Sequence, residues 1–299
     1  MEPWIALSIM AAAFQTLRFM LQKQLSMGAL SALGATFARF AYAAPFAAGL
    51  AIGTLIWAGQ GLPPLGARFW PYALTGGLAQ ILATWCVVAL FATRNFAVGI
   101  TFKKTEVVLT ALVGLIVLGD RVSAPGMVAI LVGLGGVLVL SDPPGGGRGL
   151  GRFVNRAAGL GLASGLFFAV SAVAYRGATL EVASDLPFLR AILSVACVTA
   201  AQSLAMAGWM AWREPGQLTR VWAARGKAVW MGLASMGGSI GWFSAFTLQN
   251  AAYVFAVGQI EVILSILVSV LFFRERISGR EYLGIALLTV SILGLVLLG

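Results

Sequence analysis

Histidine is absent from the 299-residue chain, and charged residues make up only 10% of it. Without histidine, His-ligated zinc sites, Ser-His-Asp triads and His proton relays are excluded. The two cysteines, Cys86 and Cys197, lie in apolar runs and have no CxxC partner, so we expect neither a disulfide framework nor a metal site. The chain also has no Walker sequence, and we predict no cofactor.

Hydrophobic residues make up 60% of the chain, and its mean hydropathy is +0.94. Soluble proteins carry about 25% charged residues, so this composition predicts a protein that spans a lipid bilayer many times. The net charge of +10 would suggest a nucleic-acid partner in a soluble protein. In a membrane protein it fits basic loops that face anionic lipid headgroups, and we expect no nucleic-acid partner.

Charges, prolines and glycines bound ten apolar stretches in the chain. They cover residues 4–25, 33–57, 70–92, 96–118, 124–141, 158–180, 186–211, 228–249, 252–273 and 279–298. The sequence therefore predicts an all-α integral membrane protein with ten transmembrane helices. A basic segment rich in proline and glycine, 142–157, separates a first five-helix repeat, 1–141, from a second, 158–299.

The two halves match without a gap when the first is shifted by 155 positions. Identical residues under this shift include Gly77 and Gly232, Asn95 and Asn250, Glu106 and Glu261, Arg121 and Arg276, and Ser123 and Ser278. This match indicates an internal duplication. Because each repeat has an odd number of spans, the second would enter the membrane inverted, as in many secondary transporters.

Basic residues between the predicted spans favour one orientation. The connections after odd-numbered spans hold Lys23, Arg94, Arg148, Arg152, Arg156, Arg213, Arg220, Arg225, Lys227, Arg274, Arg276 and Arg280. The connections after even-numbered spans hold only Arg68, Arg121 and Arg176. The positive-inside rule then places the first set in the cytoplasm of a bacterial-type inner membrane and both termini outside.

Glu106 and Glu261 lie about ten residues into their spans, which is roughly 15 Å and close to the bilayer midplane. Charges at that depth normally face a bundle interior or a wet cavity. Each glutamate shares a helix face with small or polar residues, so both are candidates for binding a substrate, a proton or both. The alternative is structural, with Glu106 paired to a neighbouring lysine and Glu261 held by a facing helix.

Further cations lie inside the spans without a counterpart in the other half. Lys103 and Lys104 correspond to Gly258 and Gln259, and Arg18 lies deep in the first span. Three cations, Arg18, Lys103 and Lys104, then stand against two glutamates at the midplane, which favours an anionic or zwitterionic substrate. A structural pairing of Arg18 with a carboxylate or with helix-end carbonyls is equally compatible with the sequence.

Aromatic side chains in the predicted spans complete the candidate binding residues. Trp85, Trp242 and Tyr253 could stack on a ring or cover an apolar part of a substrate. Aromatic residues in membrane spans more often contact lipid or neighbouring helices. The candidate site therefore comprises Glu106, Glu261, Lys103, Lys104, Arg18, Gln259, Trp85, Trp242 and Tyr253.

Residues 105–123 and 260–278 resemble the EamA-type repeat of the drug/metabolite transporter superfamily. That repeat has an apolar span, a turn with an acid and an arginine, and a last span with glycine. Fourteen residues separate Glu106 from Asp120 and Glu261 from Glu275, the family's spacing from an acid-proline pair to the turn acid. Valine replaces the proline in both halves, so a helix break there is not expected. Arg39 and Arg190 match an arginine often found early in the second span.

The resemblance implies a ten-helix inverted-repeat bundle around a cavity lined by spans 1, 3, 4, 6, 8 and 9. It also implies metabolite transport, often by proton coupling or exchange. We predict a monomeric secondary transporter of a small anionic or zwitterionic metabolite, with membrane lipids and protons as further partners. The alternatives are an intramembrane enzyme or flippase acting on a lipid-linked group, an exporter of cationic or apolar drugs, and a non-transporting membrane subunit.

Overall fold

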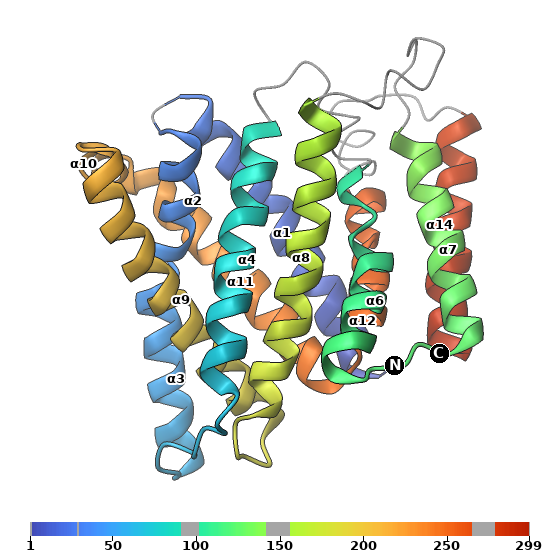
Figure 1. Ribbon diagram of the computed structural model, residues 1–299, viewed down its shortest axis with the longest axis horizontal. Helices are drawn as coiled ribbons and strands as arrows, with labels where there is room; N and C mark the ends of the chain where they lie inside the picture. Colours follow the sequence, from blue (N-terminus) through green and yellow to red (C-terminus); the bar gives the residue numbers. More distant parts are fainter. Residues whose placement is uncertain (1, 29, 91–101, 142–155, 265–278, 299) are drawn as a thin grey trace.

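The computed structural model describes residues 2–28, 30–90, 102–141, 156–264 and 279–298, and these residues form an all-helical bundle (Figure 1). The helices are α1 (Pro3–Ser26), α2 (Ala32–Ala41), α3 (Ala44–Ala58), α4 (Phe69–Leu90), α6 (Glu106–Leu118), α7 (Ala124–Ser141), α8 (Arg156–Leu180), α9 (Pro187–Arg213), α10 (Gln217–Ala223), α11 (Arg225–Leu248), α12 (Ala251–Gly258) and α14 (Gly279–Leu298). The all-α prediction is confirmed. The linker residues 142–155, the turn residues 274–278, and Arg94, Asn95 and Gly299 lie outside the described residues.

Five segments are long and apolar enough to cross a membrane by length and composition. They are Pro3–Ser26, Ala32–Ala58, Phe69–Leu90, Arg156–Leu180 and Pro187–Arg213. Shorter apolar helices cover Glu106–Leu118, Ala124–Val139, Ala251–Leu264 and Tyr282–Leu297. Large apolar side chains stand on the outer surface, including Ile116, which is 82% exposed, and Trp57, which is 83% exposed. Such a surface suits lipid better than water.

The predicted span 33–57 is interrupted in the structure. Helix α2 ends at Ala41 and α3 starts at Ala44, with Pro45 in its first turn. A proline nitrogen has no hydrogen to donate to the carbonyl four residues earlier, which here belongs to Ala41, so the helix cannot continue through it. By contrast, α9 has its proline, Pro187, in the first turn and is continuous over 27 residues. Helix α10 was not predicted from the sequence.

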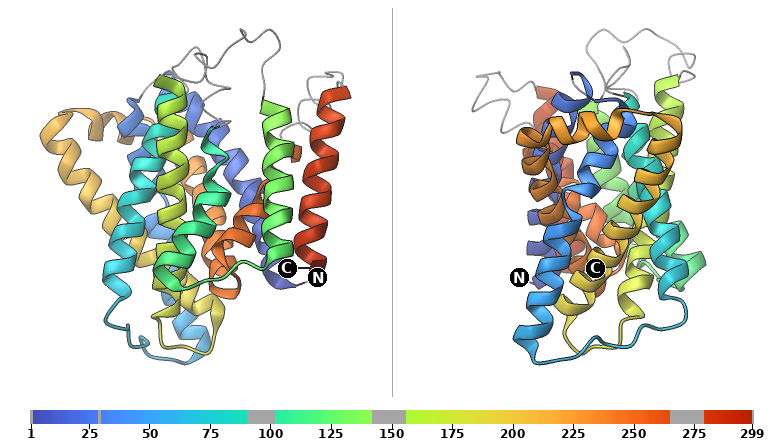
Figure 2. Two further views of the ribbon diagram at one scale, coloured as in Figure 1. Left: turned by 45° about the vertical axis from the view of Figure 1, so that its right-hand side comes forward. Right: turned by 90° about the vertical axis from the view of Figure 1, so that its left-hand side faces the viewer.

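Helices from the first half of the chain pack against helices from the second half. Helix α1 lies along α11, α4 lies along α8, and α7 pairs with α14 at one edge of the bundle (Figures 1 and 2). Each of these contacts joins an element before residue 142 to one after residue 155. The two halves therefore share one core and do not form separate lobes.

Both termini lie at the same end of the bundle, which we call the terminal end (Figure 1). The α1–α2 connection, α10, the end of α7 and the start of α8 lie at the opposite end, which we call the linker end. Helix α1 thus runs from the terminal end to the linker end, and α2 returns antiparallel to it.

The α7–α14 contact generates a stability prediction. A Cβ atom at Gly136 would stand 2.9 Å from the Gly284 carbonyl oxygen, whereas one at Gly135 meets nothing within 4 Å. We expect Gly136→Val to force the helices apart and to lower the free energy of unfolding by about 1–3 kcal/mol. Gly135→Val makes the same change in helix propensity on an open face and is the matched control. Thermal unfolding in detergent gives the melting temperatures of the two variants. Equal melting temperatures would contradict close packing of α7 against α14 at Gly136.

Candidate functional site

The helical path is interrupted just before each midplane glutamate. Lys104 and Thr105 form a turn, and α6 begins at Glu106. In the second half α12 ends at Gly258, Gln259 forms a turn, and the helix resumes at Ile260, one residue before Glu261. The expectation of no helix break, based on the missing prolines, is therefore wrong. Broken helices expose backbone groups inside a bundle, and transporters commonly bind substrates at such breaks.

Two ion pairs join these breaks, the first buried and the second partly buried. Lys103 Nζ lies 3.0 Å from Glu106 Oε1, and Lys104 Nζ contacts Glu261 Oε1. The first pair is local to one helix turn, whereas the second joins the first half of the chain to the second. These are the contacts of the structural alternative, in which Glu106 pairs with a neighbouring lysine and Glu261 is held by a facing helix. The ring of Phe168 lies 5.0 Å from Lys103 Nζ.

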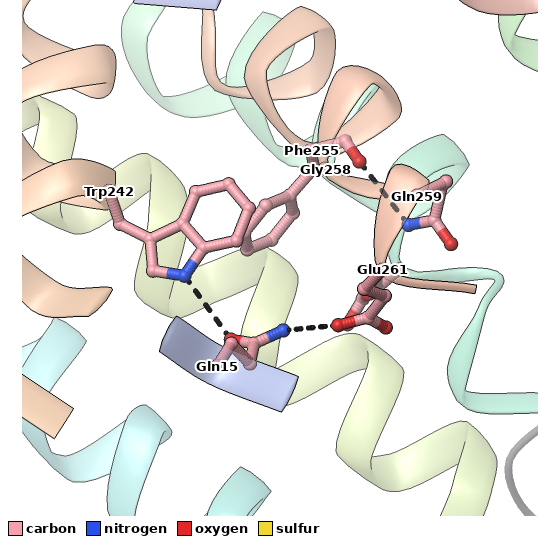
Figure 3. A pocket seen from close by; sticks show the side chains of 7 residues that line it. Gln15, Trp242, Phe255, Gly258, Gln259 and Glu261 are labelled. Atoms are coloured by element: carbon pink, nitrogen blue, oxygen red, sulfur yellow. Dashed lines mark hydrogen bonds between the residues drawn. The ribbon is translucent and has the colours of Figure 1, made fainter. Parts of the chain in front are cut away.

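Two further helices reach Glu261 through one side chain. Gln15 of α1 donates its amide hydrogen to Glu261 Oε2 at 2.8 Å, and its amide oxygen accepts from the indole nitrogen of Trp242 on α11 at 3.2 Å (Figure 3). Gln259 donates to the carbonyl of Phe255, and its own amide oxygen is buried with no hydrogen-bond partner among the residues that the structure describes. Glu261 is thus linked directly to α1 and to the turn before α6, and through Gln15 to α11.

A small cavity lies beside these charges. It is lined by Gln15, Glu106, Trp242, Phe255, Gly258, Gln259 and Glu261 (Figure 3). Its volume is about 10 Å³, enough for about one water molecule. A second cavity of about 20 Å³ shares Gln15, Trp242 and Phe255 with the first and continues to Gln80 and Tyr175. The glutamates therefore border a small cavity between the helices, which is too small for a metabolite in this conformation.

The cavity is closed toward the terminal end by aromatic rings and then by a polar network. Trp242, Phe246 and Phe255 pack against one another with ring centroids 5.3–6.0 Å apart. Beyond them, Arg176 forms an ion pair with Asp120 at 2.7 Å and donates to the backbone carbonyls of Phe246 and Gln249. This arginine ties α8, the α6–α7 turn and the end of α11 together.

Several predicted residues lie elsewhere. Tyr253 belongs to the closure at the terminal end, where its hydroxyl bonds the backbone nitrogen and the hydroxyl of Ser123. Trp85 is 38% exposed on α4 and lines none of the cavities described above, so its place does not support a cavity role. Arg18 is 2% exposed and bonds Gln22, four residues further along α1. Arg190 bonds the Thr179 carbonyl near the terminal end.

Sequence reasoning missed three polar groups. Arg39, which the sequence places only as a match to the family's arginine, is 4% exposed and bonds Ser235 and Thr84 inside the bundle. Gln80 and Gln202 form a buried network with Tyr175. Within the described ranges, no group of three Asp, Glu, Cys or His side chains is arranged to hold a metal ion. The site offers paired charges and amides, which suit binding of a charged organic molecule.

The Lys104–Glu261 pair can be tested with a double-mutant cycle. Lys104→Met leaves Glu261 buried without its nearest cation, and we expect a loss of about 3–5 kcal/mol in unfolding free energy. The double variant Lys104→Met/Glu261→Met buries no uncompensated charge and should regain most of that stability. Unfolding in detergent measures both variants together with Glu261→Met. Additive effects of the two single changes would contradict a direct pair.

A comparison with solved structures finds a protein whose fold is similar to that of this chain. A solved structure described as "Crystal structure of protein" has a TM-score of 0.69 and 18% sequence identity, and the similarity covers 97% of this chain and 99% of that chain. At this identity, the similarity shows a shared fold. No curated protein matches the sequence.

The family model named "EamA-like transporter family" matches residues 155–297, which include α8 to α14 and the glutamate of the second half. This match covers the second predicted repeat. It agrees with the resemblance to the drug/metabolite transporter superfamily that the sequence motifs indicated. Over residues 155–297, the chain is therefore similar to the EamA-like transporter family.

Proposed function

We propose that this chain is a secondary active transporter that moves a small anionic or zwitterionic metabolite, such as an amino acid, across the inner membrane by alternating access. The observation that carries this proposal is the partly buried Lys104–Glu261 pair, which joins the two halves beside the central cavity. The family match supports membrane transport in general. The substrate class follows from the charges at the pair.

An inverted repeat is supported by helix boundaries as well as by sequence. Adding 155 to Ala32 and Ala58, the ends of the broken α2–α3 segment, gives 187 and 213, the bounds of α9. The same shift relates α1 to α8 and α4 to α11. The α1–α11 contact then corresponds to the α8–α4 contact, as expected if a two-fold axis relates two five-helix repeats. We propose repeats at 1–141 and 158–299.

A zwitterion can replace the internal ion pair without leaving a buried charge uncompensated. Its carboxylate would take the place of Glu261 at Lys104, and its ammonium would take the place of Lys104 at Glu261. A simple cation would satisfy the glutamate but leave the lysine unpaired, which is costly in a low-dielectric interior. Exchange of partners at this pair would therefore couple substrate binding to the contact between the halves.

Alternating access requires the closure at the terminal end to open. In this conformation the aromatic cluster and the Arg176–Asp120 pair separate the cavity from that end. We propose that this closure breaks when the halves rock apart, exposing the site to the face where the termini lie. By the positive-inside rule, that face is outside the cell and the linker end is cytoplasmic. A monomer contains all the residues of the proposed site.

Transport assays test the substrate class. We expect proteoliposomes with the native chain to take up zwitterionic or anionic metabolites from a labelled panel. Lys104→Gln and Glu261→Gln should each reduce uptake at least tenfold, because each leaves one substrate charge unpaired. Arg68→Gln removes an exposed positive charge and is the control. Uptake only of cations or apolar drugs would contradict the proposed substrate, and turnover of a lipid-linked compound in detergent would contradict transport as the activity.

Proton coupling is the second role proposed for the two glutamates. Desolvation favours the protonated form of a carboxyl group, while the neighbouring lysines favour the charged form, so proton uptake depends on breaking an ion pair. We expect a pH gradient to drive uptake by the native chain and Glu106→Gln or Glu261→Gln to remove that dependence. Initial uptake rates with and without a gradient measure it. If uptake by both variants still depended on the pH gradient, this would contradict proton coupling by these residues.

A further inference from the structure

Two arginines are buried in the half of the bundle toward the linker end, and their partners are neutral. Arg18 of α1 is 2% exposed and Arg39 of α2 is 4% exposed. Arg18 Nη1 donates to the Gln22 amide oxygen at 3.2 Å. Arg39 donates from Nε to the Ser235 hydroxyl at 2.9 Å and from Nη1 to the Thr84 hydroxyl at 2.6 Å.

Neither guanidinium has a carboxylate partner among the residues that the structure describes. The ion pairs found there involve Lys103, Lys104 and Arg176. Nη2 of Arg18 is buried and has no hydrogen-bond partner within the described part of the chain. Arginine cannot shed its charge as lysine can, and burying an unpaired charge is costly. Two such groups in one bundle therefore require an anion that the described residues do not supply.

Helix geometry brings the two guanidinium groups to one level of the bundle. Gln22 donates to the backbone carbonyl of Ala35, so α1 and α2 meet there. Arg18 lies four residues before Gln22, and Arg39 lies four residues after Ala35. Because the helices are antiparallel, both arginines stand one turn deeper than that contact and on the same faces as the contacting residues.

Aromatic rings lie beside both guanidinium groups. The ring of Phe19 lies 4.0 Å from the Arg18 guanidinium carbon, and the ring of Phe40 lies 4.8 Å from that of Arg39. The two positive charges repel each other when no anion lies near them. Along α1, Arg18 is three residues beyond Gln15, which bonds Glu261, a rise of about 4.5 Å.

We propose that Arg18 and Arg39 bind an anionic group of the substrate, a second carboxylate in addition to the one received at Lys104. The role of the site rests on the proposed transport function, whereas anion binding by the two arginines does not. The substrate would then be a dicarboxylic zwitterion: one carboxylate at Lys104, the ammonium at Glu261 and the second carboxylate at the arginines. A guanidinium presents several N–H donors to a carboxylate and forms strong charge-assisted hydrogen bonds.

L-glutamate and L-glutamine provide a matched probe pair, because they differ mainly in the charge of the distal group. We expect glutamate to raise the melting temperature of the purified native chain more than glutamine does, through tighter binding to the folded state. Arg18→Gln and Arg39→Gln should weaken glutamate binding at least tenfold and leave glutamine binding nearly unchanged. Arg68→Gln, an equal change of net charge on the surface, should keep the difference between the ligands.

Conservative variants keep the test informative if a glutamine variant fails to fold. Arg18→Lys and Arg39→Lys keep a positive charge but lose the planar fork, so we expect a smaller loss of glutamate binding. Equal stabilisation by both ligands in the native chain, no stabilisation by either, or an unchanged glutamate preference in the folded arginine variants would each overturn the proposal. The protein is purified with neutral lipid only, so that an anionic headgroup cannot occupy the site.

Uptake measurements separate this proposal from the transport function. If glutamate binds through the arginines but proteoliposomes take up no metabolite, the transport function fails and the anion site stands. If uptake depends on Lys104 and Glu261 but not on Arg18 or Arg39, the anion site fails and transport stands.

Discussion

The charges of Lys104 and Glu261 can be buried between the two halves because each compensates the other. The free energy needed to remove two charges from water can exceed the free energy gained from their attraction. Such a pair is therefore poor evidence of added stability. Separating it inside the bundle, however, would leave both charges uncompensated. Moving the turn before α6 away from the segment after α12 therefore costs free energy, unless another group replaces the missing partners. Gln15 extends this constraint to α1 and α11 through its bonds to Glu261 and Trp242.

The interruptions before Glu106 and Glu261 place that constraint at the centre of the bundle. A continuous helix would satisfy its own backbone groups and present side chains on regular faces only. The turn at Lys104–Thr105 instead lets two adjacent lysines reach glutamates in different halves, Lys103 to Glu106 and Lys104 to Glu261. The charge pairing thus depends on the helix break. Because each lysine has a glutamate partner, both lysines can be buried at the centre of the bundle.

Much of this arrangement could be predicted from the sequence, because it depends on local periodicity and on rare charges. The helical class and the buried place of Glu106 follow from apolar runs and depth. The break at Pro45 and the burial of Arg39 were missed for different reasons. A proline early in an apolar run can start a helix or split one. An arginine near a span end reaches lipid or turns inward according to which neighbours offer acceptors, and Thr84 and Ser235 are distant in sequence.

The two ends of the bundle are held by different kinds of contact. At the terminal end, Arg176 has its carboxylate, Asp120, together with two backbone carbonyls, so opening there requires a complete set of bonds to break. Toward the linker end, Arg18 and Arg39 have only amide and hydroxyl partners among the described residues. An anion arriving from the linker end would add interactions without breaking an ion pair, whereas access from the terminal end must first break one. In the proposed transporter, this charge distribution would favour binding from the linker end.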